Sequence, residues 1–177
     1  MSFKKINDVY IADTATVLGE VHLEAGVNIW YGASIRGDVA KISIGKNTNV
    51  QDNATVHCDG GFPNVIGENV TIGHNAVCHG EYIGDGTLVG MGAIILGRTK
   101  IGKNCVVAAG TVVPPGTEVP DGMVIMGVPG KVRREANDAE KGFMERNPPH
   151  YVNLAKLHFE EKETEPRVIT WNGNVED

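Results

Sequence analysis

The chain has 177 residues, with 22 acidic against 16 basic side chains and a formal net charge of -6 at pH 7. This acidic balance argues against a nucleic-acid-binding surface, and the sequence contains no apolar run of about 18 residues that could span a membrane. Three cysteines without a CxxC spacing, and an N-terminus without the apolar segment of a signal peptide, favour a cytoplasmic location.

The dominant pattern is a six-residue repeat of aliphatic residues, which begins at Ile11 and ends near Gly130. Glycine often follows the aliphatic residue, and a small or β-branched residue often lies four places after it. A short fixed period predicts a solenoid, because each unit can bury its apolar side only by stacking on its neighbours. The repeated positions are Ile11, Val17, Leu23, Ile29, Ile35, Ile44, Val50, Val56, Ile66, Ile72, Cys78, Ile83, Val89, Ile95, Ile101, Val107, Val113, Val119 and Ile125.

A period of six fits neither an amphipathic helix nor a strand of ordinary length, but it fits a short strand followed by a tight corner. Three such units close a triangular coil of about 18 residues, and successive coils stack at about 4.8 Å. Glycine, asparagine and aspartate between the aliphatic positions suit corners that need left-handed backbone angles. We therefore predict parallel β-coils over residues 1–130, and the sustained register disfavours the alternative of a sandwich or barrel of short strands.

Residues 131–177 form a second predicted region, a helical appendage and tail in which charged residues are denser. A short helix is expected over residues 139–146, capped by the Asn-Asp pair before it. The proline pair 148–149 interrupts this helix, and its second proline suits the first turn of another helix that extends to about Glu163. The partly apolar face of the second helix favours packing along the coils or against another subunit. Residues 168–171 are expected to add a terminal strand.

Three of the six histidines occupy related positions in the repeat. His57 and His79 are each the second residue of a hexad on the same predicted face, one coil apart. Their Cα atoms should therefore lie about 5 Å apart, with both side chains outward. His74 is the third residue of a hexad on the preceding face and points away from this pair.

Two stacked imidazoles can share one metal ion, and a threefold trimer would bring His74 of the partner subunit to the stacked pair. Three imidazoles with an open fourth position suit a zinc ion that activates water. A single surface histidine on such a scaffold is ordinary, so the stacking of His57 and His79 is what favours a metal site.

Several motifs around these histidines resemble those of γ-class carbonic anhydrases in the hexapeptide-repeat family. They are Ile35-Arg36-Gly37-Asp38, Asn49-Val50-Gln51-Asp52-Asn53, Val56-His57, Ile72-Gly73-His74, Val77-Cys78-His79-Gly80, the Gly90 to Ala93 run and the Gly127 to Gly130 exit. The resemblance covers nearly the whole chain and implies an all-β fold, a left-handed parallel β-helix, along which the predicted C-terminal helix would pack. It also implies a homotrimer that shares its metal between subunits and hydrates CO2 reversibly to bicarbonate.

The repeat places further motif residues near the predicted metal. Arg36 lies on the face of the histidine pair one coil earlier, Asp38 follows two residues on, and Asp52 stacks below His74. Buried between subunits, this arginine and the two carboxylates would pair across the interface and fix the trimer. The family gives Gln51 a hydrogen bond to the metal-bound water or hydroxide. The expected metal is Zn2+, with Fe2+ or Co2+ as alternatives that imidazole ligands accept.

The proton-transfer part of the family pattern is incomplete in this chain. The archaeal prototype of the family has one glutamate directly after the aspartate matched by Asp38, where this chain has Val39. It has another in an acidic loop after the first histidine, where this chain offers only Asp59. Glu81 or Tyr82, close in sequence to the second stacked histidine, could substitute. The sequence therefore supports a metal site more strongly than fast catalysis.

Two other functions are compatible with the fold. A CoA-dependent acyltransferase would use one histidine as a general base and would not need two stacked imidazoles. A non-catalytic trimeric accessory protein would keep the interface but tolerate loss of the histidines. Metal content separates both alternatives from the carbonic anhydrase hypothesis.

Overall fold

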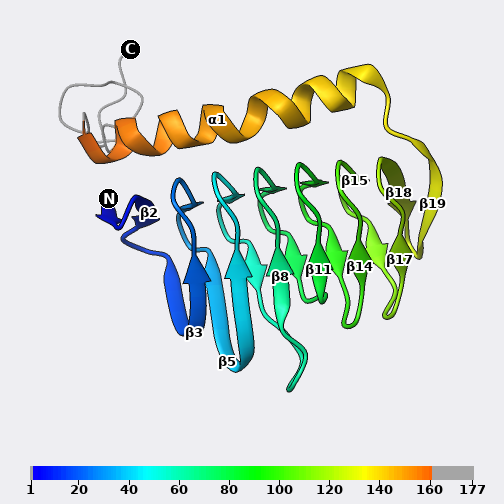
Figure 1. Cartoon of the computed structure of the whole chain (residues 1–177), viewed down its shortest axis with the longest axis horizontal. Coiled ribbons are helices and arrows are strands. Elements are labelled where there is room, and N and C mark those ends of the chain that lie inside the picture. Colours follow the sequence, from blue (N-terminus) through cyan, green and yellow to red (C-terminus); the bar gives the residue numbers. More distant parts are fainter. Residues whose placement is uncertain (1, 161–177) are drawn as a thin grey trace, which may run out of the picture.

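A computed structural model describes residues 2–160 as a solenoid of short parallel strands with one helix alongside (Figure 1). The first face is one sheet, whose strands are, in spatial order, β1 (Phe3–Ile6), β2 (Val9–Ala12), β4 (Asn28–Ile29), β6 (Asn49–Val50), β9 (Thr71–Ile72), β12 (Leu88–Val89), β15 (Val106–Val107), β18 (Met123–Gly127) and β19 (Gly130–Glu135). The β1–β2 and β18–β19 pairs are antiparallel and close the two ends of this sheet. The last strand, β19, extends past the predicted boundary at residue 130.

The second and third faces form a single sheet, because β3 (Thr16–Leu23) and β5 (Ser34–Ile44) each run around the corner between them. The second face continues from β5 through β7 (Thr55–Val56), β10 (Val77–Cys78), β13 (Ile94–Ile95) and β16 (Val112–Val113). The third continues through β8 (Asn64–Ile66), β11 (Tyr82–Ile83), β14 (Lys100–Ile101) and β17 (Glu118–Val119).

The pairing register confirms the predicted hexads. Val50 pairs with Ile72 on the first face, Val56 with Cys78 on the second, and Ile66 with Ile83 on the third. Residues three hexads apart therefore stack, and the repeat can be used to place side chains. The left hand of the coil stays a prediction from the family resemblance.

The core is a column of these aliphatic side chains, with alanines and threonines filling the corners from inside. Cys78 lies in this column, and complete burial raises the pKa of its thiol to about 12. It therefore acts as a packing residue. The predicted corner geometry is also confirmed, since five corner asparagines adopt positive φ angles: Asn47, Asn53, Asn69, Asn75 and Asn104.

A continuous helix, α1 (Asp138–Glu160), runs back along the first face toward the N-terminus (Figure 1). The predicted break at the proline pair is therefore wrong. Each proline removes one backbone hydrogen bond from a helix interior, but Met144, Pro148 and Ala155 are buried against the coils. Most helix stability in proteins comes from such packing, which outweighs the local preference.

The predicted strand at residues 168–171 lies outside the described residues. Within residues 2–160, the structure has no helix with both the length and the apolar character needed to cross a membrane.

The start of α1 is closed by a reciprocal cap. Asn137 Oδ1 accepts the N–H of Glu140 at 2.9 Å, and Glu140 Oε2 accepts the N–H of Asn137 at 2.8 Å. Arg134 also pairs with Glu140 and lowers the pKa of that carboxyl. We expect Asn137→Ala to lower the free energy of unfolding by about 1 kcal/mol, because it leaves a helical N–H without its acceptor. Urea denaturation measures this loss; an unchanged midpoint would show that the cap contributes nothing to stability.

Candidate metal centre

His57 and His79 lie at the corner where β7 and β10 leave the second face. The centroids of their rings are 5.1 Å apart, with 54° between the ring planes. The strands before them are in register, since Val56 pairs with Cys78. The stacked arrangement predicted from the hexads is confirmed, and its two imidazoles are close enough to bind one metal ion together.

Two carboxylates flank this imidazole pair. Asp38 Oδ1 lies 3.1 Å from His57 Nε2, and Asp59 Oδ1 lies 3.1 Å from His79 Nε2. Asp38 also pairs with Arg36 in the same chain. The hydrogen bond from His57, and then that from Arg36, hold the pKa of Asp38 below its usual value. Both carboxylates come from segments that project from the solenoid at this corner, β5 and the loop at residues 57–63 (Figure 1).

His74 lies on the first face, away from the pair. Its Nδ1 is 2.9 Å from Asp52 Oδ2, which confirms that Asp52 stacks beneath it. Within residues 2–160 of one chain, no group of three or more His, Cys, Asp or Glu side chains is arranged to hold a metal ion. One chain therefore offers an imidazole pair at one corner and a single imidazole elsewhere, so the pair fits a metal ion only if further ligands come from outside the chain.

Gln51 lies on the same face as His74 and not beside the imidazole pair of its own chain. The residue is 4% exposed, and its Nε2 donates to Asn49 Oδ1 at 3.0 Å. Asn49 in turn donates to Thr71 Oγ1 at 3.0 Å, and Asn147 of α1 donates to the same oxygen at 3.0 Å. This network fixes the orientation of the Gln51 amide.

A pocket of about 300 Å³ lies between the first face and α1, next to Gln51. It is largely apolar and includes Gly73, which directly precedes His74. The six-residue repeat does not predict this pocket, because Phe143 and Tyr151 from α1 form one wall. In the sequence, the feature that points to this pocket is the apolar face expected for the C-terminal helix. The pocket is lined by Gln51, Thr71, Gly73, Leu88, Val89, Gly90, Met91, Val106, Val107, Ala108, Ala109, Phe143, Asn147 and Tyr151.

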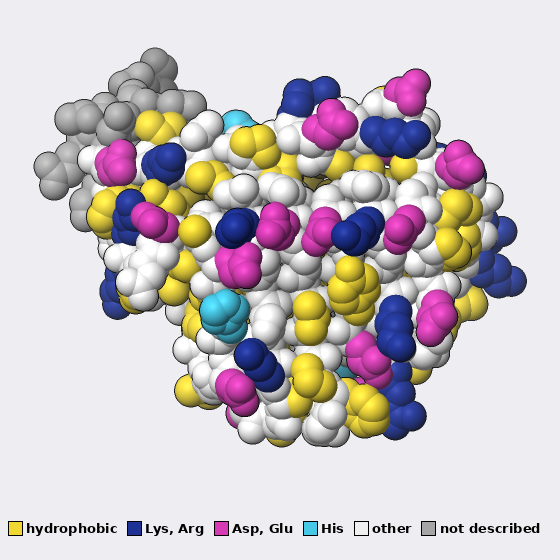
Figure 2. Space-filling view, in the orientation of Figure 1, with side chains coloured by type: hydrophobic (Ala, Val, Ile, Leu, Met, Phe, Trp, Pro, Cys, Tyr) yellow, Lys and Arg dark blue, Asp and Glu magenta, His cyan; other side chains and the backbone are white. Residues whose placement is uncertain are grey.

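The other two predicted proton-transfer residues lie elsewhere. Tyr82 belongs to β11 on the third face, and Glu81 lies 3.8 Å from Lys100 Nζ of the neighbouring strand on that face. Figure 2 shows acidic and basic side chains interspersed over this face. The five-residue step from Cys78 to Ile83 carries the chain around the corner, so residues close to His79 in sequence leave its face.

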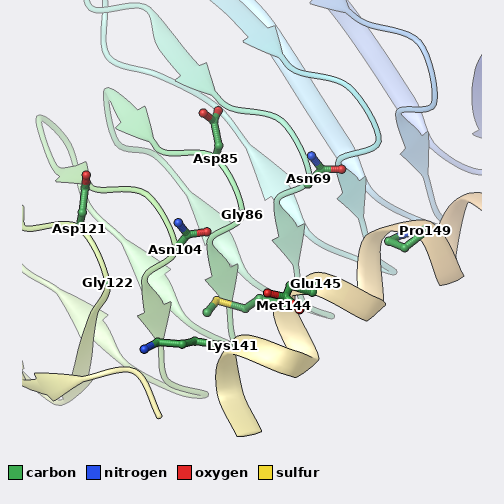
Figure 3. A pocket seen from close by; sticks show the side chains of 10 residues that line it. All are labelled: Asn69, Asp85, Gly86, Asn104, Asp121, Gly122, Lys141, Met144, Glu145 and Pro149. Atoms are coloured by element: carbon green, nitrogen blue, oxygen red, sulfur yellow. The ribbon is translucent and has the colours of Figure 1, made fainter. Parts of the chain in front are cut away.

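A larger cavity, of about 760 Å³, lies on the opposite side of α1 (Figure 3). Its two aspartates already have structural partners: Asp85 accepts the N–H of Glu68 at 3.0 Å and pairs with Lys103 at 2.8 Å. Asp121 accepts the N–H of Lys103 at 2.8 Å. The ten residues that line this cavity include no histidine, so the candidate centre is the imidazole pair.

Comparison with known proteins agrees with the repeat. Residues 82–115 match the family described as bacterial transferase hexapeptide (six repeats), and residues 63–97 match the hexapeptide repeat of succinyl-transferase. Gamma carbonic anhydrase 2, mitochondrial, of Arabidopsis thaliana is 42% identical to this chain. The alignment covers 87% of this chain but 58% of the length of that protein. A protein of Methanocaldococcus jannaschii named probable carbonic anhydrase is 44% identical, over 84% of this chain and 94% of that protein.

The chain belongs to the gamma carbonic anhydrase-like hexapeptide-repeat family. The same architecture occurs in the crystal structure of a hexapeptide transferase family protein from Anaplasma phagocytophilum, with a TM-score of 0.74 and 33% identity. That alignment covers 84% of this chain and 91% of the other. The proteins that this chain resembles are thus named for two different chemistries.

Proposed function

We propose that this protein is a metal-dependent carbonic anhydrase, which converts CO2 and water reversibly to bicarbonate and a proton. The functional unit would be a homotrimer with one metal ion at each subunit interface. His57 and His79 of one subunit would hold the ion together with His74 of the partner subunit. The observation that carries this proposal is the stacked imidazole pair, with the third histidine displaced to another face of the same chain.

Zinc is the expected metal, and when bound by three imidazoles it would acidify a water molecule and so supply hydroxide for attack on CO2. The chain's own contribution begins with ligand orientation. Asp38 and Asp59 contact the two stacked imidazoles, and Asp52 contacts His74. Carboxylates in such contacts fix the ring orientation and tautomer of imidazole ligands.

The first face offers a place for substrate. CO2 is small and apolar, and the pocket of about 300 Å³, whose lining includes the residue before His74, is largely apolar. The Gln51 amide borders this pocket, and its orientation is held by Asn49. In the proposed trimer, the Gln51 amide would therefore face the imidazole pair of the partner subunit. There it is suited to form a hydrogen bond with an oxygen atom of water or CO2.

Asp59 is the best candidate to accept the released proton. Its carboxylate contacts His79, and 47% of its side-chain surface is exposed, so a proton can pass from it to solvent. Val39, where the archaeal prototype has a glutamate, is 49% exposed and cannot take part in proton transfer. Because Asp59 is then the single carboxylate that accepts the proton, we propose that CO2 hydration is slow.

A cytoplasmic location also stays a prediction.

The acyltransferase alternative is supported by the transferase named among the solved structures. In that function one histidine would act as a general base without a metal. A purely structural trimer is the third possibility. Both are separated from the carbonic anhydrase proposal by metal content.

The test combines metal analysis with stopped-flow CO2 hydration on protein prepared anaerobically with iron and separately with zinc. We expect about one metal ion per subunit, and at least about a 100-fold loss of hydration in His79→Ala. The matched control is His22→Ala, which removes an exposed histidine of β3, on the third face, and should keep wild-type metal content and rate. Acetyl-CoA turnover that survives His79→Ala, in protein without bound metal, would overturn the proposal.

A further inference from the structure

The corners of the regular coils are closed by a short backbone hydrogen bond. The carbonyl of the second residue in a hexad accepts the N–H of the residue three places on. Ala54 donates to Gln51, and Ala76 donates to Gly73, each at 3.1 Å. These bonds hold the second position of a regular hexad at a fixed place on the coil. His57 and His79 also occupy second positions, but neither carbonyl accepts this bond, and the N–H of Tyr82, three places after His79, donates to Thr99 instead.

At His57 this closure is replaced. The chain leaves the coil there for the loop at residues 57–63 and returns with Asn64, the first residue of β8. The side-chain amide of Asn64 donates to the carbonyl of His57 at 2.9 Å and to the carbonyl of Cys78 at 3.2 Å. Cys78 directly precedes His79, and its carbonyl also accepts the N–H of His57 at 3.1 Å. One buried amide thus ties the backbone of both histidine segments together.

This arrangement has an energetic cost. Asn64 is fully buried, and its Oδ1 has no hydrogen-bond partner among the described residues. A buried acceptor without a donor destabilises a folded protein, because it loses its hydrogen bonds to water and gains none in return. Turning the amide over would not help, because Oδ1 would then face two carbonyl oxygens. The hydrogen bonds that Asn64 makes are therefore those of its two amide donors, and both join the histidine segments.

We propose that Asn64 is a positioning residue, which fixes the separation of the two imidazoles by bridging the carbonyls of His57 and Cys78. The consequence for metal binding rests on the proposed function, whereas the consequence for imidazole spacing does not. Asn64 touches neither ring; it acts on the backbone that carries them. A metal ion held by two imidazoles is sensitive to such support, because small changes in ligand spacing weaken coordination.

The test compares Asn64→Leu with Asn28→Leu. Asn28 is an equally buried asparagine on the first face, which donates to Gly26 and accepts from Trp30. Zinc affinity is measured by chelator competition on trimers checked by light scattering. We expect zinc binding to weaken about 10- to 100-fold in Asn64→Leu and by less than about threefold in Asn28→Leu. Unchanged affinity in Asn64→Leu, or equal losses in both variants, would overturn the inference.

A second measurement needs no metal. In metal-free protein with isotope-labelled histidine rings, wild type and Asn28→Leu should show a nuclear Overhauser effect between the His57 and His79 rings, which Asn64→Leu should lose. If wild-type protein binds no zinc, the proposed function fails, and this ring contact alone decides the inference. If Asn64→Leu does not fold, Asn64→Asp takes its place, since it keeps the shape but removes both amide donors. A ring contact retained in the folded variant would refute the positioning role.

Discussion

A one-to-one mixture of His74→Ala and His79→Ala chains, unfolded and reassembled together, should recover about one quarter of the wild-type zinc sites. Neither variant alone should bind zinc at the proposed site. The reason is geometric: His57 and His79 stack in one chain, whereas His74 lies on another face. In a mixed trimer, an interface is complete when a chain with an intact stacked pair meets a partner subunit with an intact His74. Random assembly forms that combination at about one interface in four.

The matched control is a mixture of His57→Ala and His79→Ala. These variants damage the same imidazole pair, so no arrangement of the two chains restores it, and zinc content should stay at background. The measurement is zinc per trimer after removal of loosely bound metal, with CO2 hydration followed in parallel. Zinc recovery in the control, or none in the first mixture, would show that the metal site is not divided between subunits in the proposed way.

The stacked pair could be predicted because the six-residue period is a local property with a direct spatial meaning. Once Val56 and Cys78 were placed on one face, the next residue of each hexad had to project from the same corner. The pairing of Asp52 with His74 followed from the same counting. Where the repeat is regular, sequence position and spatial position are nearly interchangeable.

The side chains that the repeat places poorly are those at its departures from regularity. Glu81 and Tyr82 are close to His79 in sequence, but the five-residue step to Ile83 turns them onto the third face. Asn64 was not recognised at all, because its role depends on where the loop after His57 returns. Loop closure is a long-range property that no local pattern encodes.

The helix was mispredicted for a different reason. The proline pair at 148–149 disfavours a helix locally, and this local preference is what the sequence pattern of the segment displays. In the folded chain, Met144 and Ala155 on either side of the prolines are buried against the first face. Tertiary packing over the whole length of α1 decides the outcome. Similarly, the pocket beside Gln51 exists only because α1 covers that face.

The glycines that follow the aliphatic residues lead to the second large effect, which concerns stability. Gly84 does not have a positive φ angle, so backbone conformation does not require a glycine there. Instead, a Cβ atom at this position would lie 2.6 Å from the backbone carbon of Gly102 and 2.6 Å from the nitrogen of Lys103 in the next coil. Neither atom belongs to a flexible side chain, so the coils themselves would have to move apart.

We therefore expect Gly84→Ala to lower the free energy of unfolding by about 2–3 kcal/mol, although alanine normally stabilises a chain relative to glycine. Gly60→Ala is the matched control, because a Cβ there meets nothing within 4 Å and its φ angle is not positive. Its effect should stay within about 1 kcal/mol. Denaturation midpoints compared at equal protein concentration measure both, since subunit assembly makes stability depend on concentration. Equal midpoints for the two variants would mean that the coils tolerate wider spacing, and that glycine is placed after the aliphatic residue for some reason other than close approach.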